Sequence, residues 1–159
     1  MTTDWSTWQP RERANLCFVV RGDQVLLIHK KRGLGAGKIN GPGGRIEPGE
    51  TAAEAAVREV QEELGVTPRD PQPRGELHFQ FTDAYSLHCK VFVADGCDGE
   101  ATETEEAIPL WCRHDEIPFE RMWADDAHWL PGVLAGRSFR GFFEFDNDTM
   151  LAHQVEWLG

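Results

Sequence analysis

The stretch TAAEAAVREVQEELG, residues 51–65, leaves the fewest structural choices open. Thr51 followed by Glu54 is the capping-box pattern of a helix N-terminus. The residues between them and Gly65 are strong helix formers, and Gly65 suits the left-handed residue that ends a helix. The sequence therefore predicts one helix over 52–64. By their three-to-four-residue spacing, the residues expected to face the core are Ala53, Val57, Val60 and Leu64.

The end of this helix carries an unusual charge. Glu59, Glu62 and Glu63 stand at i, i+3 and i+4, so their side chains share one patch. A helix C-terminus favours cations, so three carboxylates there are locally unfavourable. One interpretation is a solvated glutamate face, and the other is a divalent-cation site that removes the repulsion. The seven glycines of the preceding segment 30–50 favour the cation site, because such a loop lets the backbone approach a ligand closely.

Carboxylates arranged in this way suit the cleavage of a phosphoanhydride, whose dense negative charge repels attacking water. Mg²⁺ neutralises that charge and positions the water, and it prefers oxygen ligands from carboxylates, water and phosphates. Gly44 can offer its backbone carbonyl as a further ligand. Arg58 is expected to pair with Glu62 across one turn and to orient it.

From Gly44 to Val66 the chain reads G-x5-E-x7-R-E-V-Q-E-E-L-G-V, which resembles the motif of the Nudix family at every fixed position. The resemblance implies an α/β (α+β) Nudix fold, with a mixed β-sheet sandwiched between helices. It also implies Mg²⁺ as the cofactor, with Mn²⁺ as a substitute. The metal ligands that the resemblance implies are Glu59, Glu62 and Glu63, and Gly44 and Glu106 are further candidate ligands. The expected catalytic residues are Arg58, Glu59, Glu62, Glu63 and Glu106.

The general base varies within that family and often lies outside the motif. Glu105 and Glu106 are the candidates, in the acidic segment 96–107. Glu106 is preferred because it directly precedes an expected strand. The alternative for this segment is a charged turn without a catalytic role.

Two further segments, 30–51 and 117–145, resemble the mammalian-type oxidized purine nucleoside triphosphatases, or 8-oxo-dGTP diphosphatases, within the Nudix family. The resemblance implies that the base lies in a pocket of a loop asparagine, a Trp-x-Asp-Asp segment and aromatic residues. The matching positions are Asn40, Phe79, Phe81, Trp123, Asp125 and Asp126. Lys30 is a further candidate that approaches base or phosphate, with an ordinary surface lysine as the alternative.

The chemistry of these residues is consistent with such a pocket. Asn40 offers a donor and an acceptor to a base edge, and Trp123 offers a stacking face. Asp125 and Asp126 need not both be ionised when buried together, so one can donate to a purine carbonyl while the other accepts from a ring N–H. The alternatives are that the two aspartates cap a helix and that the aromatic residues belong to the core.

The chain departs from this closer pattern at three positions. Ile39 replaces the tryptophan before the loop asparagine, Leu34 replaces a loop aromatic, and Asn15 replaces a small hydroxyl residue on the first strand. Asn15 either adds a hydrogen bond to the base or rejects the favoured substrate. Asn15 and Leu34 therefore join the expected substrate-binding residues.

The leading functional prediction is hydrolysis of oxidized purine nucleoside triphosphates, such as 8-oxo-dGTP or 2-hydroxy-dATP, to the monophosphate and pyrophosphate. This reaction would sanitise the nucleotide pool. Two alternatives stay open. One is a Nudix pyrophosphohydrolase for a plain nucleotide triphosphate, ADP-ribose or a dinucleoside polyphosphate, and the other is a non-catalytic nucleotide-binding module.

Composition narrows the class of protein. The chain has 159 residues, 40% of them apolar and 27% charged, which is typical of one globular domain. The net charge of -11 argues against a nucleic-acid polymer as partner. No apolar run is long enough for a membrane span or a signal peptide, so a cytoplasmic location is expected. The sequence leaves the oligomeric state open, with a monomer favoured. The four scattered cysteines predict no zinc pair, and the sequence leaves a disulfide open.

Residues 1–13 form the expected polar N-terminal tail, in which Trp5 and Trp8 can contact the body, and residues 14–159 a single domain. The expected strands are 14–20, 24–30, 76–83, 85–95, 108–113, 137–145 and 149–157. The expected loops are 30–50, 68–75 and 96–107. A short helix is expected over 126–136.

Overall fold

The hairpin expected near the start of the chain forms β1 (Glu12–Arg21) and β2 (Gln24–Lys30), which turn at Gly22. The computed structural model describes residues 1–159. The other strands are β3 (Ile39–Asn40), β4 (Gly43–Arg45), β5 (Thr67–Pro68), β6 (Gln72–Phe81), β7 (Ser86–Asp95), β8 (Cys97–Asp98), β9 (Ala107–Arg113), β10 (Phe139–Asp146) and β11 (Thr149–Trp157). The helices are α1 (Ala52–Leu64), the short 3-10 helix η1 (Phe119–Arg121) and α2 (Asp126–Leu134).

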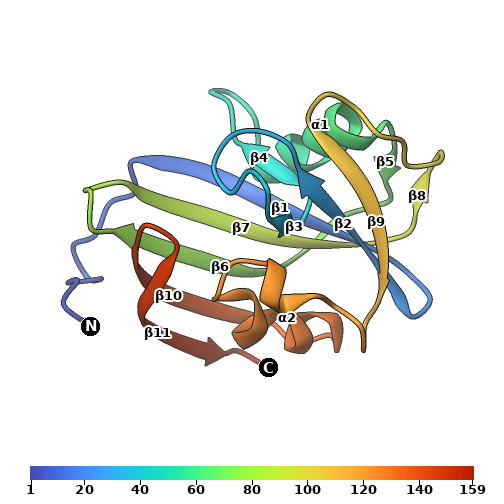
Figure 1. Ribbon diagram of the computed structural model, residues 1–159. Coiled ribbons are helices and arrows are strands. Elements are labelled where there is room, and N and C mark those ends of the chain that lie inside the picture. The colour runs from blue at the N-terminus through green and yellow to red at the C-terminus, as the bar shows by residue number, and fades with distance from the viewer.

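Nine strands form one mixed sheet in the order β11-β10-β6-β7-β1-β2-β3, with β4 added to β1 and β9 added to β2. β1 runs parallel to β7 and β10 runs parallel to β6, whereas the other pairs are antiparallel. β5 and β8 form a separate two-stranded ribbon. Figure 1 shows α1 and α2 on opposite sides of the sheet, so the predicted mixed sheet between helices is confirmed.

Alternate residues of β1 enter two different cores, as a strand requires. Cys17 and Val19 pack with α1 on one face, whereas Phe18 packs with α2 on the other. The rings of Phe18 and Trp129 meet edge to face at 5.8 Å. Each helix therefore covers its own face, and the strands between them are buried from both sides.

The helix predicted over 52–64 is confirmed at both ends. Thr51 and Glu54 form the capping box, and Gly65 takes the left-handed conformation at φ 73°. The predicted core face is confirmed at Val60 and Leu64, which are buried, and wrong at Ala53, which is exposed; Val57 is half-buried and lies outside the core. The helix lies on the sheet along the row Ala56, Val60 and Leu64, which turns Ala53 toward solvent.

The expected loops are more ordered than their composition indicates. β3 and β4 lie within 30–50, β8 lies within 96–107, and β6 begins inside 68–75. Short polar or glycine-rich segments pair here because a neighbouring strand edge offers hydrogen-bond partners, which the local sequence does not reveal. All four cysteines are free thiols. Neither helix combines the length and apolar character that crossing a lipid bilayer requires.

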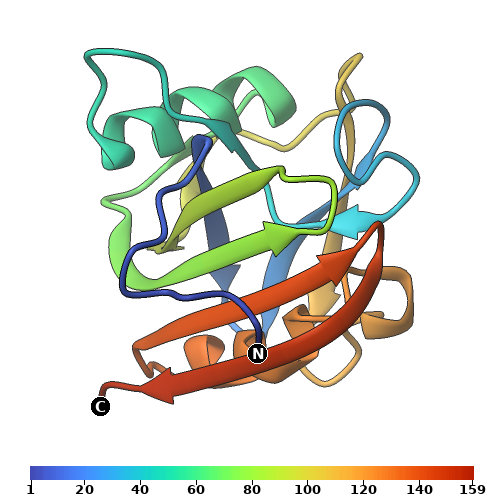
Figure 2. The same ribbon diagram turned by 90° about the vertical axis from the view of Figure 1, so that its left-hand side faces the viewer.

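The N-terminal segment packs along the sheet instead of projecting from it. β1 starts at Glu12, inside the segment predicted as tail. Thr3 N–H donates to the Glu144 carboxylate over 2.8 Å, and the rings of Trp5 and Phe142 lie 5.2 Å apart. Figure 2 shows this segment crossing in front of β6 toward β10. The tryptophans contact the body of the protein, as the sequence predicts.

Candidate active site

The three glutamates at the end of α1 lie at different depths. Glu63 is buried, with 3% of its surface exposed. The side chain of Glu59 is 14% exposed and that of Glu62 is 50% exposed. The patch expected from the helical spacing therefore runs from the interior to solvent. Glu63 and Glu59 are its most buried side chains.

Gly43 and Gly44 of β4 lie directly against these carboxylates. The Gly43 N–H donates to Oε1 of Glu63 over 2.7 Å. A Cβ at Gly44 would collide with the Glu59 carboxylate, so the close approach depends on glycine at that position. The glycine loop and the charged helix end thus meet in one place, held there by the pairing of β4 with β1.

Arg58 connects the carboxylates of this region. It pairs with Glu62 at 3.2 Å, as predicted, and its Nη1 also donates to Glu59 over 2.8 Å. Its strongest partner is Glu50, which accepts from Nε at 2.7 Å and from Nη2 at 2.9 Å. These bonds lower the pKa of Glu50 to about 2. The two-point contact fixes the guanidinium, which in turn positions Glu59 and Glu62.

The electrostatics at the helix end favour a cation. Burial raises the pKa of Glu63 to about 8, and the like charges of Glu59 and Glu106 raise it as well. Burial also raises the pKa of Glu59. Carboxylates crowded away from water are stabilised by a proton or by a hard divalent cation with oxygen ligands. The donor set therefore fits Mg²⁺.

The side chains are not gathered into a closed ligand set. No three of Glu59, Glu62, Glu63 and Glu106 have ligand atoms within 4.8 Å of one another. Glu59 and Glu62 face Arg58, and Glu63 accepts from Gly43. Binding of a metal ion between them would require these side chains to exchange partners. The metal roles of the four glutamates and of Gly44 stay predictions.

The acidic segment before β9 is docked onto the end of α1. Thr104 Oγ1 donates to the Glu63 carbonyl over 2.7 Å, and the Thr102 N–H donates to the Leu64 carbonyl over 3.0 Å. This docking brings Glu106 close enough for its charge to act on Glu59 and Glu63. Glu105 is exposed. The structure thus favours Glu106 over Glu105 as the general base, a role that stays a prediction.

A single cavity on the α2 side of the sheet is lined by every residue that is expected to bind the base. It extends from the Trp123 segment to the end of α1, because Gly44 and Glu63 line it too. The expected residues found in it are Asn15, Lys30, Leu34, Asn40, Phe79, Phe81, Trp123, Asp125 and Asp126. The phosphate-side and base-side candidates therefore belong to one continuous site.

Three buried polar atoms in this cavity have no hydrogen-bond partner. They are both amide atoms of Asn15 and Oδ1 of Asp125. Asn15 is 1% exposed and Asp125 is 2% exposed. Native proteins rarely leave buried polar atoms unpaired, and an unpaired set that lines a cavity indicates a polar ligand. The two residues together present a donor and acceptors to that ligand.

The pKa values of the two adjacent aspartates, Asp125 and Asp126, are both raised. Burial raises the pKa of Asp125 to about 6, although the Trp129 N–H bond at 2.9 Å lowers it. Burial and the charge of Asp125 raise the pKa of Asp126 well above its usual value. The expectation of a helix cap is wrong for Asp125, because it stands at the N-cap of α2 without making the capping hydrogen bond.

The aromatic wall serves both the core and the cavity. Phe81 and Trp123 meet edge to face at 6.2 Å, and both pack on Phe145. Gly35 approaches the Trp123 ring at a left-handed φ of 83°, where a Cβ would come within 2.7 Å of the indole nitrogen. The glycine loop thus closes over the tryptophan. Phe79, Phe81 and Trp123 therefore pack against the core and also line the cavity, and their role in binding a base stays a prediction.

Lys30 lines the cavity close enough to the motif glutamates for their charges to act on it. Its Nζ donates to the Leu34 carbonyl over 2.7 Å. Burial lowers its pKa, against the opposing charges of Glu63 and Glu59. This lysine is therefore not an ordinary surface residue. Asn40 also binds the loop, donating to the Lys38 carbonyl over 3.1 Å.

Sequence reasoning missed several supporting residues. The sequence marks Glu50 only as a fixed motif position, although its side chain holds Arg58. No sequence pattern indicates Thr104 or Lys38. Thr104 anchors the acidic segment, and Lys38 lies over the Trp123 ring at 5.3 Å. The fixed spacing between Glu50 and Arg58 could have indicated their pairing, whereas contacts between distant segments leave no local pattern.

The chain is similar in sequence and in structure to known proteins. The NUDIX domain profile matches residues 10–133. An oxidized purine nucleoside triphosphate hydrolase of Danio rerio is 42% identical over 145 residues, which are 89% of this chain and 92% of the relative. The enzyme of that name from Mus musculus is 40% identical over 142 residues, covering 88% and 91%. The crystal structure of a mutator MutT protein from Bacillus halodurans superimposes with a TM-score of 0.79 at 30% identity, covering 91% and 97%.

The family match covers the glycine loop, the glutamate helix and the segment containing Trp123, and the relatives align over nearly their whole length. The chain therefore belongs to the Nudix hydrolase family.

Proposed function

We propose that the protein hydrolyses oxidized purine nucleoside triphosphates, such as 8-oxo-dGTP or 2-hydroxy-dATP, to the monophosphate and pyrophosphate. The relatives from zebrafish and mouse carry names that state this substrate class. The reaction would remove damaged precursors from the nucleotide pool. The substrate is a small nucleotide, and the net charge of -11 disfavours a nucleic-acid polymer. The monomeric state and the cytoplasmic location stay predictions.

The observation that carries the proposal is one cavity that is lined both by the unpaired polar atoms of Asn15 and Asp125 and by the buried carboxylate of Glu63. Asn15, Asn40 and the aspartate pair would read the base edge, with Trp123 offering a face for stacking. A protonated aspartate would donate to a purine carbonyl, and an ionised one would accept from a ring N–H. A purine that carries both a carbonyl and a ring N–H on its altered edge can form both of these hydrogen bonds.

The phosphate end would be handled by the motif residues. Glu59, Glu62, Glu63 and the Gly44 carbonyl would hold Mg²⁺, or Mn²⁺ in its place, which neutralises phosphate charge when bound. Arg58 would keep Glu59 and Glu62 oriented through its contact with Glu50. Glu106 would accept the proton of the attacking water, since it lies beside this group without being buried.

The reaction is tested by product analysis on 8-oxo-dGTP with Mg²⁺. Monophosphate and pyrophosphate should appear in equal amounts, whereas release of orthophosphate alone would refute the scheme. Glu63→Gln should lower kcat by at least about a hundredfold with the fold retained, because Gln can still accept from Gly43. Glu105→Gln is the matched control and should retain activity, since Glu105 is exposed in the same segment as Glu106.

A Nudix hydrolase for another diphosphate would retain the Glu63 requirement but prefer ADP-ribose or an undamaged nucleotide. A non-catalytic binding module would show tight nucleotide binding without turnover on any of them. The buried Glu63 and the connected Arg58 argue against that alternative, because a site that only binds nucleotides needs no crowded carboxylates.

A further inference from the structure

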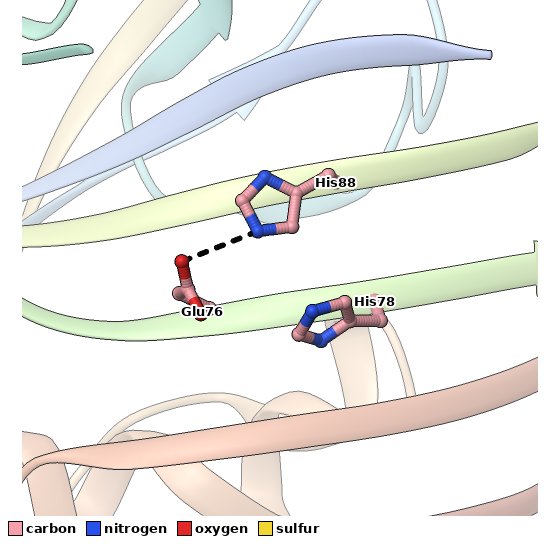
Figure 3. A group of neighbouring side chains, drawn as sticks. All are labelled: Glu76, His78 and His88. Carbon is pink, nitrogen blue, oxygen red and sulfur yellow. Dashed lines mark ion pairs between the residues drawn. The ribbon is translucent and has the colours of Figure 1, made fainter. Parts of the chain in front are cut away.

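A second group of potential metal ligands lies on the opposite face of the sheet. Leu77 and Phe79 of β6 line the cavity, so the alternating Glu76 and His78 point to the other side. His88 of β7 is the cross-strand partner of His78. One ligand atom from each of these three side chains lies within 4.8 Å of the others. Figure 3 shows the Glu76 carboxylate turned toward the His88 ring, with His78 beside them.

The imidazole of His78 is already oriented for coordination. Its Nδ1 lies 2.9 Å from the Gly141 carbonyl oxygen. A carbonyl only accepts, so Nδ1 carries the proton and Nε2 keeps its lone pair. Metal-bound histidines are usually held by this kind of bond from the other ring nitrogen. In Figure 3 one ring nitrogen of His78 lies on the side facing His88 and Glu76.

The other two ligands are also in position. Nε2 of His88 lies 3.5 Å from Oε1 of Glu76, and their side chains are 12% and 40% exposed. The His78 and His88 rings lie 5.0 Å apart. Ligands of a tetrahedral zinc ion, with bonds of about 2.1 Å, lie roughly 3.4 Å from one another. Small rotations of the side chains would bring the three atoms from 4.8 Å or less to that spacing.

An aromatic shell surrounds the group on one side. Phe142 stacks on His78 at 4.6 Å, and the Trp5 and Trp8 rings lie 6.3 and 5.5 Å from it. Such a shell limits access of solvent and strengthens metal–ligand bonds. Burial lowers the pKa of both imidazoles, so both offer the neutral form that binds metals.

We propose that Glu76, His78 and His88 form a zinc-class site on the back of the sheet, separate from the motif glutamates. Two imidazole nitrogens and one carboxylate oxygen, with water as the fourth ligand, are a common set for Zn²⁺. Mg²⁺ prefers oxygen ligands alone, so the two sites select different cations. The bound ion would join β6 to β7 behind the strands that line the cavity.

The site is tested with metal-free full-length protein titrated with Zn²⁺ by calorimetry in excess Mg²⁺, which occupies the motif glutamates. One Zn²⁺ should bind per chain and raise Tm. Glu76→Gln and His88→Gln should each weaken the affinity at least about tenfold and abolish the Tm shift. His153→Ala is the matched control, since His153 is exposed on β11 beside His128, and it should bind Zn²⁺ like the wild type.

The proposal is overturned if no Zn²⁺ binds in excess Mg²⁺, or if Glu76→Gln leaves binding intact. Loss of binding in Glu63→Gln or His153→Ala instead would also overturn it, because the ion would then lie elsewhere. If His88→Gln fails to fold, Glu76→Gln still decides the question, since its side chain is 40% exposed and keeps its volume. The readout is binding and Tm, so it does not depend on the proposed hydrolysis.

Discussion

Glu50 accepts two hydrogen bonds from Arg58, at 2.7 and 2.9 Å, across the turn that joins the glycine loop to α1. The same guanidinium donates to Glu59 over 2.8 Å. A residue outside the cavity thus fixes the orientation of a side chain that would hold the metal. We infer that Glu50 is a positioning residue for the motif.

Glu50→Gln should lower kcat about 10- to 100-fold, because a weakened contact releases Arg58 and with it Glu59. KM should change little, since Glu50 does not line the cavity. Steady-state kinetics measures both. Glu47→Gln is the matched control, since Glu47 lies 3.9 Å from Arg58 and is exposed. Equal losses in the two variants would contradict the positioning role.

Asn15→Leu should stabilise the free protein while impairing the enzyme. The substitution removes two buried unpaired polar atoms, each costing about 1–3 kcal/mol. It also removes the hydrogen bonds offered to the base, so kcat/KM for an oxidized purine should fall. Thermal unfolding and kinetics on one preparation check both effects. A variant with lower Tm and normal kcat/KM would show that Asn15 serves the fold instead.

Asp126→Asn should change the pH dependence of stability. The pKa of Asp126 is raised in the folded protein, and that of Asp125 is raised to about 6. The folded state therefore binds more protons than the unfolded state in this pH range. The stability from this pair is present at low pH and lost as the pH rises through the folded pKa values. The variant cannot ionise at this position, so its unfolding free energy relative to wild type should increase as the pH rises from about 4 toward neutral.

Denaturant titrations at several pH values in that range measure this difference. Asp70→Asn serves as the control, since Asp70 is exposed in a left-handed turn that asparagine tolerates. A difference for Asp126→Asn that stays flat or falls with pH would contradict the raised pKa of Asp126.

Trp123→Ala should raise KM for the purine substrate with a smaller effect on kcat. Stacking on an aromatic ring is worth about 1–3 kcal/mol, which corresponds to roughly 5- to 150-fold in affinity. Phe145 lies behind Trp123 and does not line the cavity, so Phe145→Leu reports the cost of disturbing the packing alone. A similar rise in KM in both variants would indicate that the tryptophan supports the core and not the base.

The helix, its capping and the meeting of its glutamates with the glycine loop followed from local patterns. Thr51, Gly65 and the spacing of Glu59 and Glu63 each carry a physical rule that acts over a few residues. The exposure of Ala53 did not follow, because it depends on how the helix lies on the sheet. The docking of Thr104 on Glu63 and of Gly35 on Trp123 joins distant segments, and no local pattern encodes such contacts.

The residues expected to bind the base could be predicted from the family resemblance but not from the periodicity of the sequence. Asn15, Phe79 and Asp125 come from separate elements, and only the folded sheet brings them into one cavity. Their lack of hydrogen-bond partners is likewise a property of the packed structure. The Glu76, His78 and His88 group was not predicted at all, since two of its members are two residues apart and the third joins them by strand register.

The most direct test of the account is a comparison of kcat/KM for 8-oxo-dGTP, 2-hydroxy-dATP, dGTP and ADP-ribose with equal enzyme and Mg²⁺. We predict that kcat/KM for at least one of the oxidized purines exceeds that for both dGTP and ADP-ribose by at least about tenfold, or 1.4 kcal/mol in transition-state binding. A preference for ADP-ribose, or equal values for dGTP and both oxidized nucleotides, would contradict it.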